Sequence, residues 1–226
     1  MSVQQTIEMS LQTLLKQKIK ILGAGRTDTG VHAKQMYAHF DFEEPLDLEN
    51  LIYKLNAFLN NDIGIANIHK VRHDSHARFD AISREYEYYI TQIKDVYNHD
   101  KKYFFSKKLD FDKIDKAIDI LKNTKNFKSF CRTKSDVTNY NCEIFDFNYE
   151  IKESEIIFRI RANRFLRNMV RSLIGTILDV SLNKISVKNL LEIIEKSNRI
   201  YAGPSVPAHA LFLSNVEYPK NVFLNE

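Results

Sequence analysis

The 226-residue sequence contains no tryptophan, only two cysteines, six glycines and four prolines. The two cysteines, Cys131 and Cys142, cannot build the disulfide framework of a small secreted domain, and a reducing compartment is their natural setting. No apolar run approaches the length that spans a membrane, and residues 1–20 lack the uninterrupted apolar core of a signal peptide. Low-complexity segments and long Pro/Gly linkers are also missing. These absences lead us to expect a cytoplasmic globular protein.

The charge is nearly balanced, with 33 Lys and Arg against 29 Asp and Glu, a net charge of +4 and a pI of about 8.9. A mildly basic chain is compatible with RNA binding, but the location of the positive charge matters more than its total. At 44% hydrophobic residues, the chain can bury a core as one large domain or two small ones.

The most informative stretch is the glycine-rich segment 22–33, which reads Leu-Gly-Ala-Gly-Arg-Thr-Asp-Thr-Gly-Val-His-Ala. It follows a β-branched run and precedes an alternating one, so we expect a loop between two strands. Within it, Asp28 lies two residues from Arg26 and is flanked by two threonines. An arginine so close keeps an aspartate ionised even in a partly dry pocket. Asp28 is therefore a candidate functional carboxylate.

Two common glycine-rich motifs do not fit this segment. A phosphate-binding P-loop requires Lys and Ser or Thr after its second glycine, but Val31 and His32 follow Gly30. A dinucleotide-binding fingerprint requires a third glycine at the position of Asp28. The segment taken alone is equally consistent with an ordinary hairpin turn and with a functional loop on a rigid scaffold.

Residues 25–33 resemble the GRTDxGVHA signature of the TruA-type tRNA pseudouridine synthases, a nine-residue motif with one free position. The resemblance implies that Asp28 is the catalytic nucleophile. The residues themselves leave open whether its carboxylate attacks ribose C1′ or removes a sugar proton. The resemblance also implies that Arg26 fills the space vacated when the target uridine flips out of its stack.

Other segments resemble the same family. Residues 76–79, His-Ala-Arg-Phe, match its HARF segment, and Tyr86 aligns with the first tyrosine of its R-x-Y-x-Y strand, which lies against the target base. Residues 161–171 match its A-x-x-F-x-x-x-MVR segment, whose last arginine reaches the catalytic aspartate. Arg171 is therefore the expected partner of Asp28. Residues 202–213 resemble the family's closing loop and last strand.

Arginine is concentrated in segment 159–171, which contains five arginines in thirteen residues. Solubility of a helix face does not require arginine, whereas bidentate contacts with phosphate do. A solvated arginine-rich face is the alternative interpretation. Together with the resemblance, this pattern predicts the following substrate-binding residues: Arg78, Tyr86, Arg161, Arg164 and Arg167.

Three histidines, His69, His73 and His76, follow one another at spacings of four and three. Imidazole is a common zinc ligand, but no cysteine or pair of carboxylates completes a ligand set here. Solvated polar residues are the favoured interpretation, and the resemblance implies that neither a metal nor a cofactor takes part.

Hydrophobic periodicity predicts helices at 3–17, 48–59, 111–121 and 166–177, and strands at 19–23, 36–43, 65–71, 82–91, 142–151 and 155–162. The polar stretch 93–110 is expected to be a long mobile connection. The resemblance implies an α+β fold of two similar ferredoxin- or RRM-like halves. Their antiparallel strands would form a central sheet with helices on one side and an active-site cleft between the halves.

We assign residues 1–80 to an N-terminal half that carries the Asp28 loop. Residues 81–226 form a C-terminal half with the Tyr86 strand and the arginine-rich strand and helix. The family's first strand, with its Tyr-Asp-Gly and Gly-Trp-Gln motifs, has no counterpart here, in agreement with the lack of tryptophan. We therefore expect an N-terminally truncated version of a longer gene product.

The resemblance implies a homodimeric isomerase that converts uridine to pseudouridine at positions 38–40 of the tRNA anticodon arm. A non-catalytic RNA-binding module is the alternative, because the arginines and the aromatic strand suit it equally well. Asp28 discriminates between the two interpretations. A carboxylate beside RNA phosphates repels them, so a protein that only binds RNA gains nothing from it. A nucleotide-dependent enzyme is disfavoured, because no intact phosphate loop is present.

Overall fold

The computed structural model describes residues 1–133 and 137–224. The chain is α+β and divides into two compact units. The smaller unit comprises Met1–Gly25, Met36–Ala81 and the segment from Tyr218 onward, and the larger comprises Arg26–Gln35 and Ile82–Glu217. The segment that carries Asp28 thus belongs to the larger unit, although the sequence-based division groups it with residues 1–80.

The smaller unit packs two helices against a short two-stranded sheet. Helix α1 (Val3–Leu15) begins at a capping box formed by Ser2 and Gln5, and α2 (Leu48–Phe58) begins at the N-cap Asp47. Strands β1 (Leu22–Gly23) and β3 (Ala38–His39) pair antiparallel. The core of this unit consists of six buried aliphatic side chains: Leu11, Ile19, Ile21, Leu51, Leu55 and Leu59.

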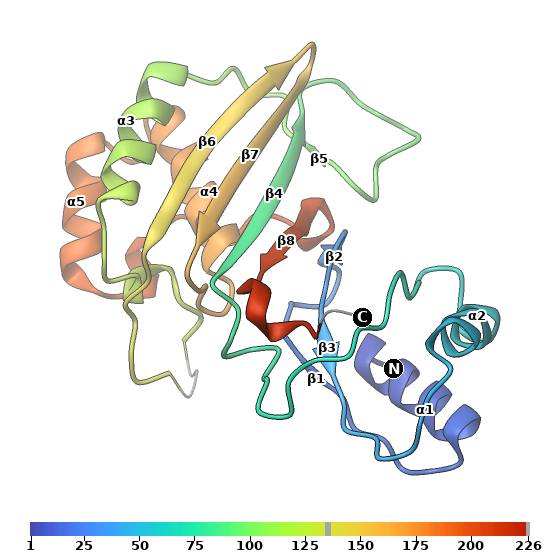
Figure 1. Cartoon of the computed structure of the whole chain (residues 1–226). Coiled ribbons are helices and arrows are strands. Elements are labelled where there is room, and N and C mark those ends of the chain that lie inside the picture. The colour runs from blue at the N-terminus through green and yellow to red at the C-terminus, as the bar shows by residue number, and fades with distance from the viewer. Residues whose placement is uncertain (134–136, 225–226) are drawn as a thin grey trace. The chain divides into compact units, whose positions relative to one another are not determined.

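The larger unit contains a six-stranded sheet in the order β2-β8-β4-β7-β6, with β5 beside β4 (Figure 1). Its strands are β2 (His32–Ala33), β4 (Ser83–Thr91), β5 (Tyr103–Phe104), β6 (Ile144–Lys152), β7 (Glu155–Ala162) and β8 (Leu211–Glu217). The pairs β4–β7, β6–β7 and β4–β8 are antiparallel, whereas β2–β8 and β4–β5 are parallel. The central sheet is therefore mostly antiparallel.

Three helices cover one face of this sheet, as Figure 1 shows: α3 (Phe111–Lys122), α4 (Met169–Ser181) and α5 (Val187–Lys196). Helix α4 is almost entirely buried, because apolar side chains occur all around its circumference. Short 3₁₀ helices connect the larger elements: Lys128–Phe130, Arg199–Tyr201, Ala208–Ala210 and Lys220–Val222.

Most long elements lie where the sequence predicts them, but short strands and connections differ. The predicted strand at 36–43 shrinks to β3, and the one at 65–71 forms only a single bridge, between Val71 and Phe223. Helix α5 was not predicted. The stretch 93–110 is more ordered than expected, because it contains β5 and because Lys102 forms ion pairs with Asp95 and Glu155. Alternation alone does not make a strand when no neighbour supplies a full ladder of hydrogen bonds.

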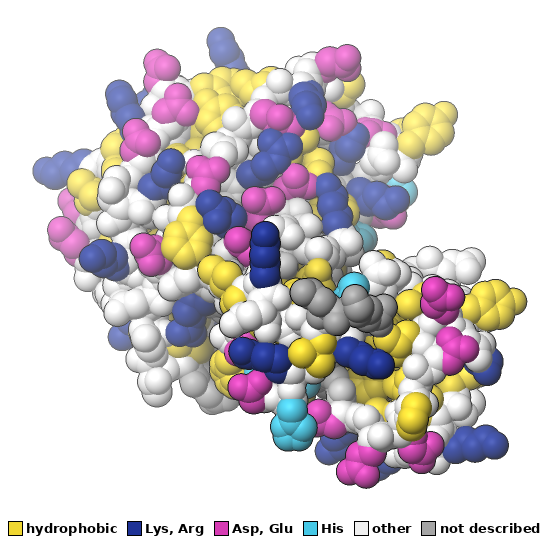
Figure 2. Space-filling view, viewed as in Figure 1, with side chains coloured by type: hydrophobic (Ala, Val, Ile, Leu, Met, Phe, Trp, Pro, Cys, Tyr) yellow, Lys and Arg dark blue, Asp and Glu magenta, His cyan; other side chains and the backbone are white. Residues whose placement is uncertain are grey.

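The opposite face of the sheet carries a dense network of ion pairs. The Glu87 carboxylate accepts hydrogen bonds from Lys34 Nζ (2.5 Å), Tyr89 Oη (2.6 Å) and Arg159 Nε (3.0 Å). Arg159 also donates from Nη2 to Glu150 (2.7 Å). Figure 2 shows basic and acidic side chains interspersed over this part of the molecule. The Arg159 guanidinium is thus occupied by two carboxylates of the protein itself.

Helix α4 and the loop after α5 approach each other closely at two glycines. A Cβ atom on Gly175 would lie 1.7 Å from the carbonyl oxygen of Pro204, and one on Gly203 would lie 2.8 Å from Thr176 Cα. The Gly203 amide donates to Thr176 Oγ1 (2.9 Å). Only glycine at these two positions allows the loop to lie against the helix backbone.

Replacement of Glu87 by Gln is expected to lower the free energy of unfolding at pH 7 by about 1–3 kcal/mol, because charged hydrogen bonds are lost at a side chain only 12% exposed. Burial raises the pKa of Glu87, but the hydrogen bonds from Lys34, Tyr89 and Arg159 outweigh it and hold the pKa below 4.5. This stabilisation is therefore present above pH 4.5 and lost as the pH falls through the folded-state value.

Urea unfolding of the wild type and Glu87→Gln at pH 7 and in mild acid measures this difference, which should shrink in acid. Glu192→Gln, which removes one partner of an exposed i,i+4 pair, serves as the control and should cost less than about 0.5 kcal/mol. An effect of Glu87→Gln that is independent of pH would contradict the assignment.

Gly175→Ala is expected to destabilise the protein by about 1–3 kcal/mol, because the new methyl group collides with the Pro204 carbonyl. The sign is informative, since Gly→Ala inside a helix otherwise stabilises by about 0.5–1 kcal/mol. Thermal or urea unfolding measures the change. Gly64→Ala is the control, because no atom lies within 4 Å of its added Cβ.

Candidate active site

The Asp28 motif is anchored to the edge of the central sheet. The last two residues of the motif form β2, which pairs in parallel with β8, and the Lys34 amide donates to Leu213 O (2.9 Å). The Gln35 side-chain oxygen accepts a hydrogen bond from the Val216 amide (2.8 Å). These hydrogen bonds attach the motif to a strand of the central sheet. A rigid support of this kind suits a site that must hold a side chain in place.

A tight turn presents the Asp28 carboxylate. The Asp28 carbonyl accepts a hydrogen bond from the Val31 amide (3.1 Å), and Gly30, the third residue of the turn, has φ of 85°. This left-handed conformation favours glycine at that position. The His32 ring stacks on Phe212, with ring centroids 4.7 Å apart. The glycine spacing of the motif therefore serves a turn that leads directly into a strand.

Arg171 binds the Asp28 carboxylate directly. Arg171 Nη1 donates to Asp28 Oδ2 at 3.0 Å, and the two side chains are 20% and 19% exposed. Arg171 Nε donates to the Val206 carbonyl (2.7 Å), and the Val206 amide donates to the Arg171 carbonyl (3.2 Å). The guanidinium is thus held on two sides, and the ion pair expected from the sequence is present.

A second arginine lies near the other carboxylate oxygen. Arg167 Nε is 3.8 Å from Asp28 Oδ1, and the Arg167 side chain is 57% exposed. Among the described residues, no other Arg or Lys nitrogen lies within 4 Å of this carboxylate. Arg26 is exposed and does not contact it. Each oxygen of Asp28 therefore has a different cationic neighbour, one held firmly and one open to solvent.

Tyr86 lies on the helix-covered face of β4 and packs against Phe165, with ring centroids 5.1 Å apart in an edge-to-face arrangement. Burial raises the pKa of Tyr86 to about 12; the charge of Arg84 opposes this rise and that of Asp28 adds to it. Tyr86 is therefore a neutral phenol at physiological pH. It can stack on a base or donate a hydrogen bond, but it is not a proton acceptor there.

The remaining predicted residues are dispersed. Arg161 belongs to the opposite sheet face from Tyr86, and its Nη1 is 3.9 Å from Glu217. Arg164 is partly buried and lies two residues beyond the end of β7. Arg78 lies in the smaller unit, with its guanidinium 5.7 Å from the centre of the Phe79 ring. The structure thus places Arg167 and Arg171 at the Asp28 carboxylate, with Tyr86 near enough for the Asp28 charge to raise its pKa.

The loop that holds Arg171 is a part of the site that sequence reasoning missed. Ser205 Oγ lies within hydrogen-bonding distance of Asn168 Nδ2 (2.6 Å) and Arg199 Nη2 (3.0 Å), which ties this loop to the start of α4. The sequence contains one signal for this loop, which is Gly175 among the large apolar residues of segment 166–177. Such a glycine indicates that another backbone approaches the helix.

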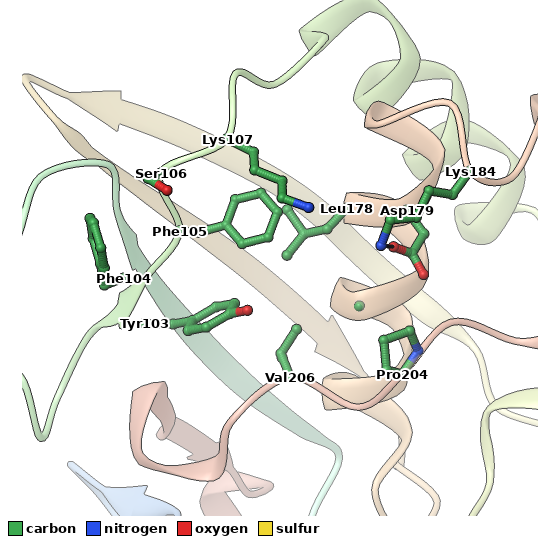
Figure 3. Close-up of a pocket in the computed structure, with 11 residues that line it drawn as sticks. Tyr103, Phe104, Phe105, Ser106, Lys107, Leu178, Asp179, Lys184, Pro204 and Val206 are labelled. Carbon is green, nitrogen blue, oxygen red and sulfur yellow. Dashed lines mark hydrogen bonds and ion pairs between the residues drawn. The ribbon is translucent and has the colours of Figure 1, made fainter.

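A cavity of about 330 Å³ lies beside this loop and is shown in Figure 3. Pro204 and Val206 line it together with Tyr103, Phe105 and Leu178. A second cavity of about 570 Å³ is lined by residues of segment 91–104 with Pro207 and His209. Asp28 does not line either cavity, and its carboxylate lies beside Arg167 and Arg171 instead.

Within residues 1–133 and 137–224, no three His, Cys, Asp or Glu side chains form a group that could hold a metal ion. None of the helices there is both long enough and apolar enough to cross a membrane.

Removal of the Arg171 guanidinium by Arg171→Met is expected to lower the free energy of unfolding by about 2–4 kcal/mol, because Asp28 and the Val206 carbonyl both lose a partner. In an Asp28→Asn background, the same change should cost about 1–2 kcal/mol less, since no buried charge is left behind. A double-mutant cycle by urea unfolding measures this coupling. Arg167→Met, at an exposed side chain, should cost less than about 1 kcal/mol, and strict additivity of the Arg171 and Asp28 changes would contradict the pairing.

Comparison with known proteins identifies the family of this chain. A family model described as tRNA pseudouridine synthase matches residues 117–219. The chain is 45% identical to a protein named tRNA pseudouridine synthase A from Parabacteroides distasonis, over 99% of this chain and 89% of that protein. The corresponding protein of Bacteroides fragilis is 44% identical over 98% and 89%. A protein of Bacillus cereus named tRNA pseudouridine synthase A 1 is 38% identical over 96% and 89%. The chain therefore belongs to the tRNA pseudouridine synthases, a family of isomerases.

Proposed function

We propose that this protein converts uridine to pseudouridine at positions 38–40 of the tRNA anticodon arm, with Asp28 as the catalytic carboxylate and without a cofactor. The observation that carries the proposal is the ion pair between Asp28 and Arg171, at 3.0 Å, which joins two segments that resemble motifs of the family. A module that only binds RNA is supported less well, because a carboxylate held by a dedicated arginine repels phosphate and adds nothing to binding.

The reaction is an isomerisation. The bond between ribose C1′ and base N1 breaks, the base turns, and a bond forms between C1′ and C5. The proton on C5 leaves to solvent, and N1 gains a proton, so no electrons enter or leave. The chemistry needs an ionised carboxylate beside the ribose and an unstacked base. Flipping a base costs a few kcal/mol, least in loops and at stem ends, which agrees with targets in the anticodon arm.

Asp28 supplies the carboxylate in this proposal. Arg171 binds Oδ2 and is itself fixed by Val206, which leaves Oδ1 as the oxygen closer to a bound ribose. This oxygen either attacks C1′ or removes a sugar proton. Arg171 acts by orienting the Asp28 carboxylate and compensating its charge, because the Asp28 side chain is only 19% exposed.

Several residues are proposed to hold the RNA. Tyr86 packs on the target base as a neutral phenol, and Arg26 fills the space that the flipped uridine leaves. Arg78, Arg161, Arg164 and Arg167 contact the phosphate backbone, so binding weakens as salt rises. Arg167 is the best placed of these, because its exposed guanidinium already lies 3.8 Å from Asp28.

We further propose, from the family resemblance, a cytoplasmic homodimer with tRNA lying across both subunits and no bound metal. The division into an N-terminal half (1–80) and a C-terminal half (81–226) belongs to the same proposal.

Tritium release from tRNA transcript labelled at uridine C5 tests the reaction directly, because formation of the C1′–C5 bond expels that hydrogen. The wild type should release tritium, and Asp28→Asn should reduce the rate by at least about 10³-fold, as expected when a group that forms or breaks bonds is lost. Asp62→Asn, at an exposed carboxylate, is the matched control and should leave the rate unchanged.

Two results would overturn the proposal in different ways. Release that persists in Asp28→Asn would remove Asp28 from the chemistry. Tight tRNA binding by the wild type with no release at any uridine would favour the RNA-binding module. Mapping of the product within the transcript decides between positions 38–40 and other uridines.

A further inference from the structure

Phe79 is an exposed aromatic side chain in the smaller unit, with 74% of its surface accessible. A phenylalanine so exposed loses the free energy of burial, about 25 cal/mol per Å² of apolar surface. Single exposed apolar residues are common, so exposure alone is not informative. The surroundings of Phe79 provide the information.

The backbone holds Phe79 outward in a well-defined turn. The amides of Phe79 and Asp80 both donate to the His76 carbonyl (3.1 and 3.0 Å). The His76 amide donates to Asp80 Oδ2 (2.7 Å), which closes the turn from its other end. The Ala77 carbonyl accepts from the Tyr218 hydroxyl, and the Ala77 amide donates to His39 Nδ1 (3.1 Å). The ring is therefore displayed by an anchored segment.

Two polar planar groups flank the ring. The His76 imidazole lies against it, with ring centroids 4.3 Å apart and an interplanar angle of 37°. His76 Nδ1 accepts a hydrogen bond from the Arg78 amide (3.1 Å), which fixes the orientation of the imidazole. The Arg78 guanidinium lies 5.7 Å from the Phe79 ring centre. Histidine, arginine and phenylalanine are side chains on which nucleobases stack.

The adjoining segment carries a small excess of positive charge. Residues 70–80 contain Lys70, Arg72 and Arg78 against Asp74 and Asp80, and Arg72 Nε lies 3.4 Å from Asp74 Oδ1. Hydrogen bonds to the C-terminal segment fix this backbone, from Arg72 N to Val222 O (3.1 Å) and from Leu224 N to Lys70 O (3.0 Å). An aromatic ring held in place beside the Arg78 guanidinium matches a nucleotide, which combines a π-face with a phosphate.

We propose that Phe79 is a stacking site for an unpaired base of the tRNA substrate, a base other than the uridine that reacts. His76 supports the ring from one side, and Arg78 binds the phosphate or extends the stack. This inference rests on tRNA as the substrate in the proposed function. A protein partner is less favoured, because the core of a protein interface is apolar, whereas an imidazole and a guanidinium flank this ring.

The lack of tryptophan allows a direct test. In the full chain carrying Asp28→Asn, Phe79→Trp introduces the sole indole, and a base stacked on it should quench its fluorescence when unlabelled tRNA transcript is added. Tyr53→Trp, at a 73% exposed aromatic on α2, is the matched control and should show little change.

Affinity for tRNA measures the contribution of the ring. Phe79→Ala and Phe79→Leu should both weaken binding by about 5- to 100-fold, because neither offers a π-face, whereas Phe79→Trp should bind as well as wild type. In turnover, Phe79→Ala should raise KM and leave kcat unchanged at saturating tRNA. Phe79→Ala removes an exposed side chain, so urea unfolding should be unaltered.

The proposal is overturned if Phe79→Trp is not quenched by tRNA, if Phe79→Ala binds as wild type, or if Phe79→Leu retains full affinity. The last result would show an apolar contact without stacking, as with a protein partner. The outcome is separable from that of the proposed function. Quenching in Asp28→Asn together with no tritium release by the wild type would support the stacking site and reject the reaction.

Discussion

The contact on which the site depends is the Arg171 guanidinium, held between the Val206 carbonyl (2.7 Å) and the Asp28 carboxylate (3.0 Å). The Val206 carbonyl is in place because its loop lies against α4, and the loop can lie there because position 175 has no side chain. Asp28 is in place because β2 pairs with β8. A charge pair therefore relies on packing and strand pairing, which are far stronger constraints on position than the pair itself.

The two faces of the central sheet use charge differently. On the helix-covered face, Tyr86 lies partly buried near the opposite charges of Arg84 and Asp28. On the opposite face, Glu87 and Glu150 both form ion pairs with Arg159. The hydrogen-bond donors of its guanidinium are thus used by carboxylates of the protein itself. The number of arginines in a segment is therefore a poor measure of its capacity for phosphate. Arg167, which is exposed, and Arg159, which is ion-paired with two carboxylates, are eight residues apart in the same arginine-rich segment.

Sequence reasoning predicted most of the long elements and one long-range ion pair. Helices α1, α2 and α3 were predicted from their apolar stripes, because burial of one face imposes a 3.6-residue period. Asp28 and Arg171 were predicted as partners from two motifs 143 residues apart. Short strands such as β2 were not, because two residues carry too little pattern, and only a neighbouring strand makes them β-structure.

By itself, the sequence determined the family, the pairing of Asp28 with Arg171 and most of the long helices. The helices follow from local hydrophobic periodicity. The family and the ion pair follow from short motifs that contain particular residue types, an aspartate and an arginine. Only the tertiary structure decided which arginines remain available, which unit contains the Asp28 segment, and that Val206 and Gly175 belong to the support of the site. The physical reason is that ion pairs and close backbone approaches depend on strand register and packing between distant segments, which no local pattern records.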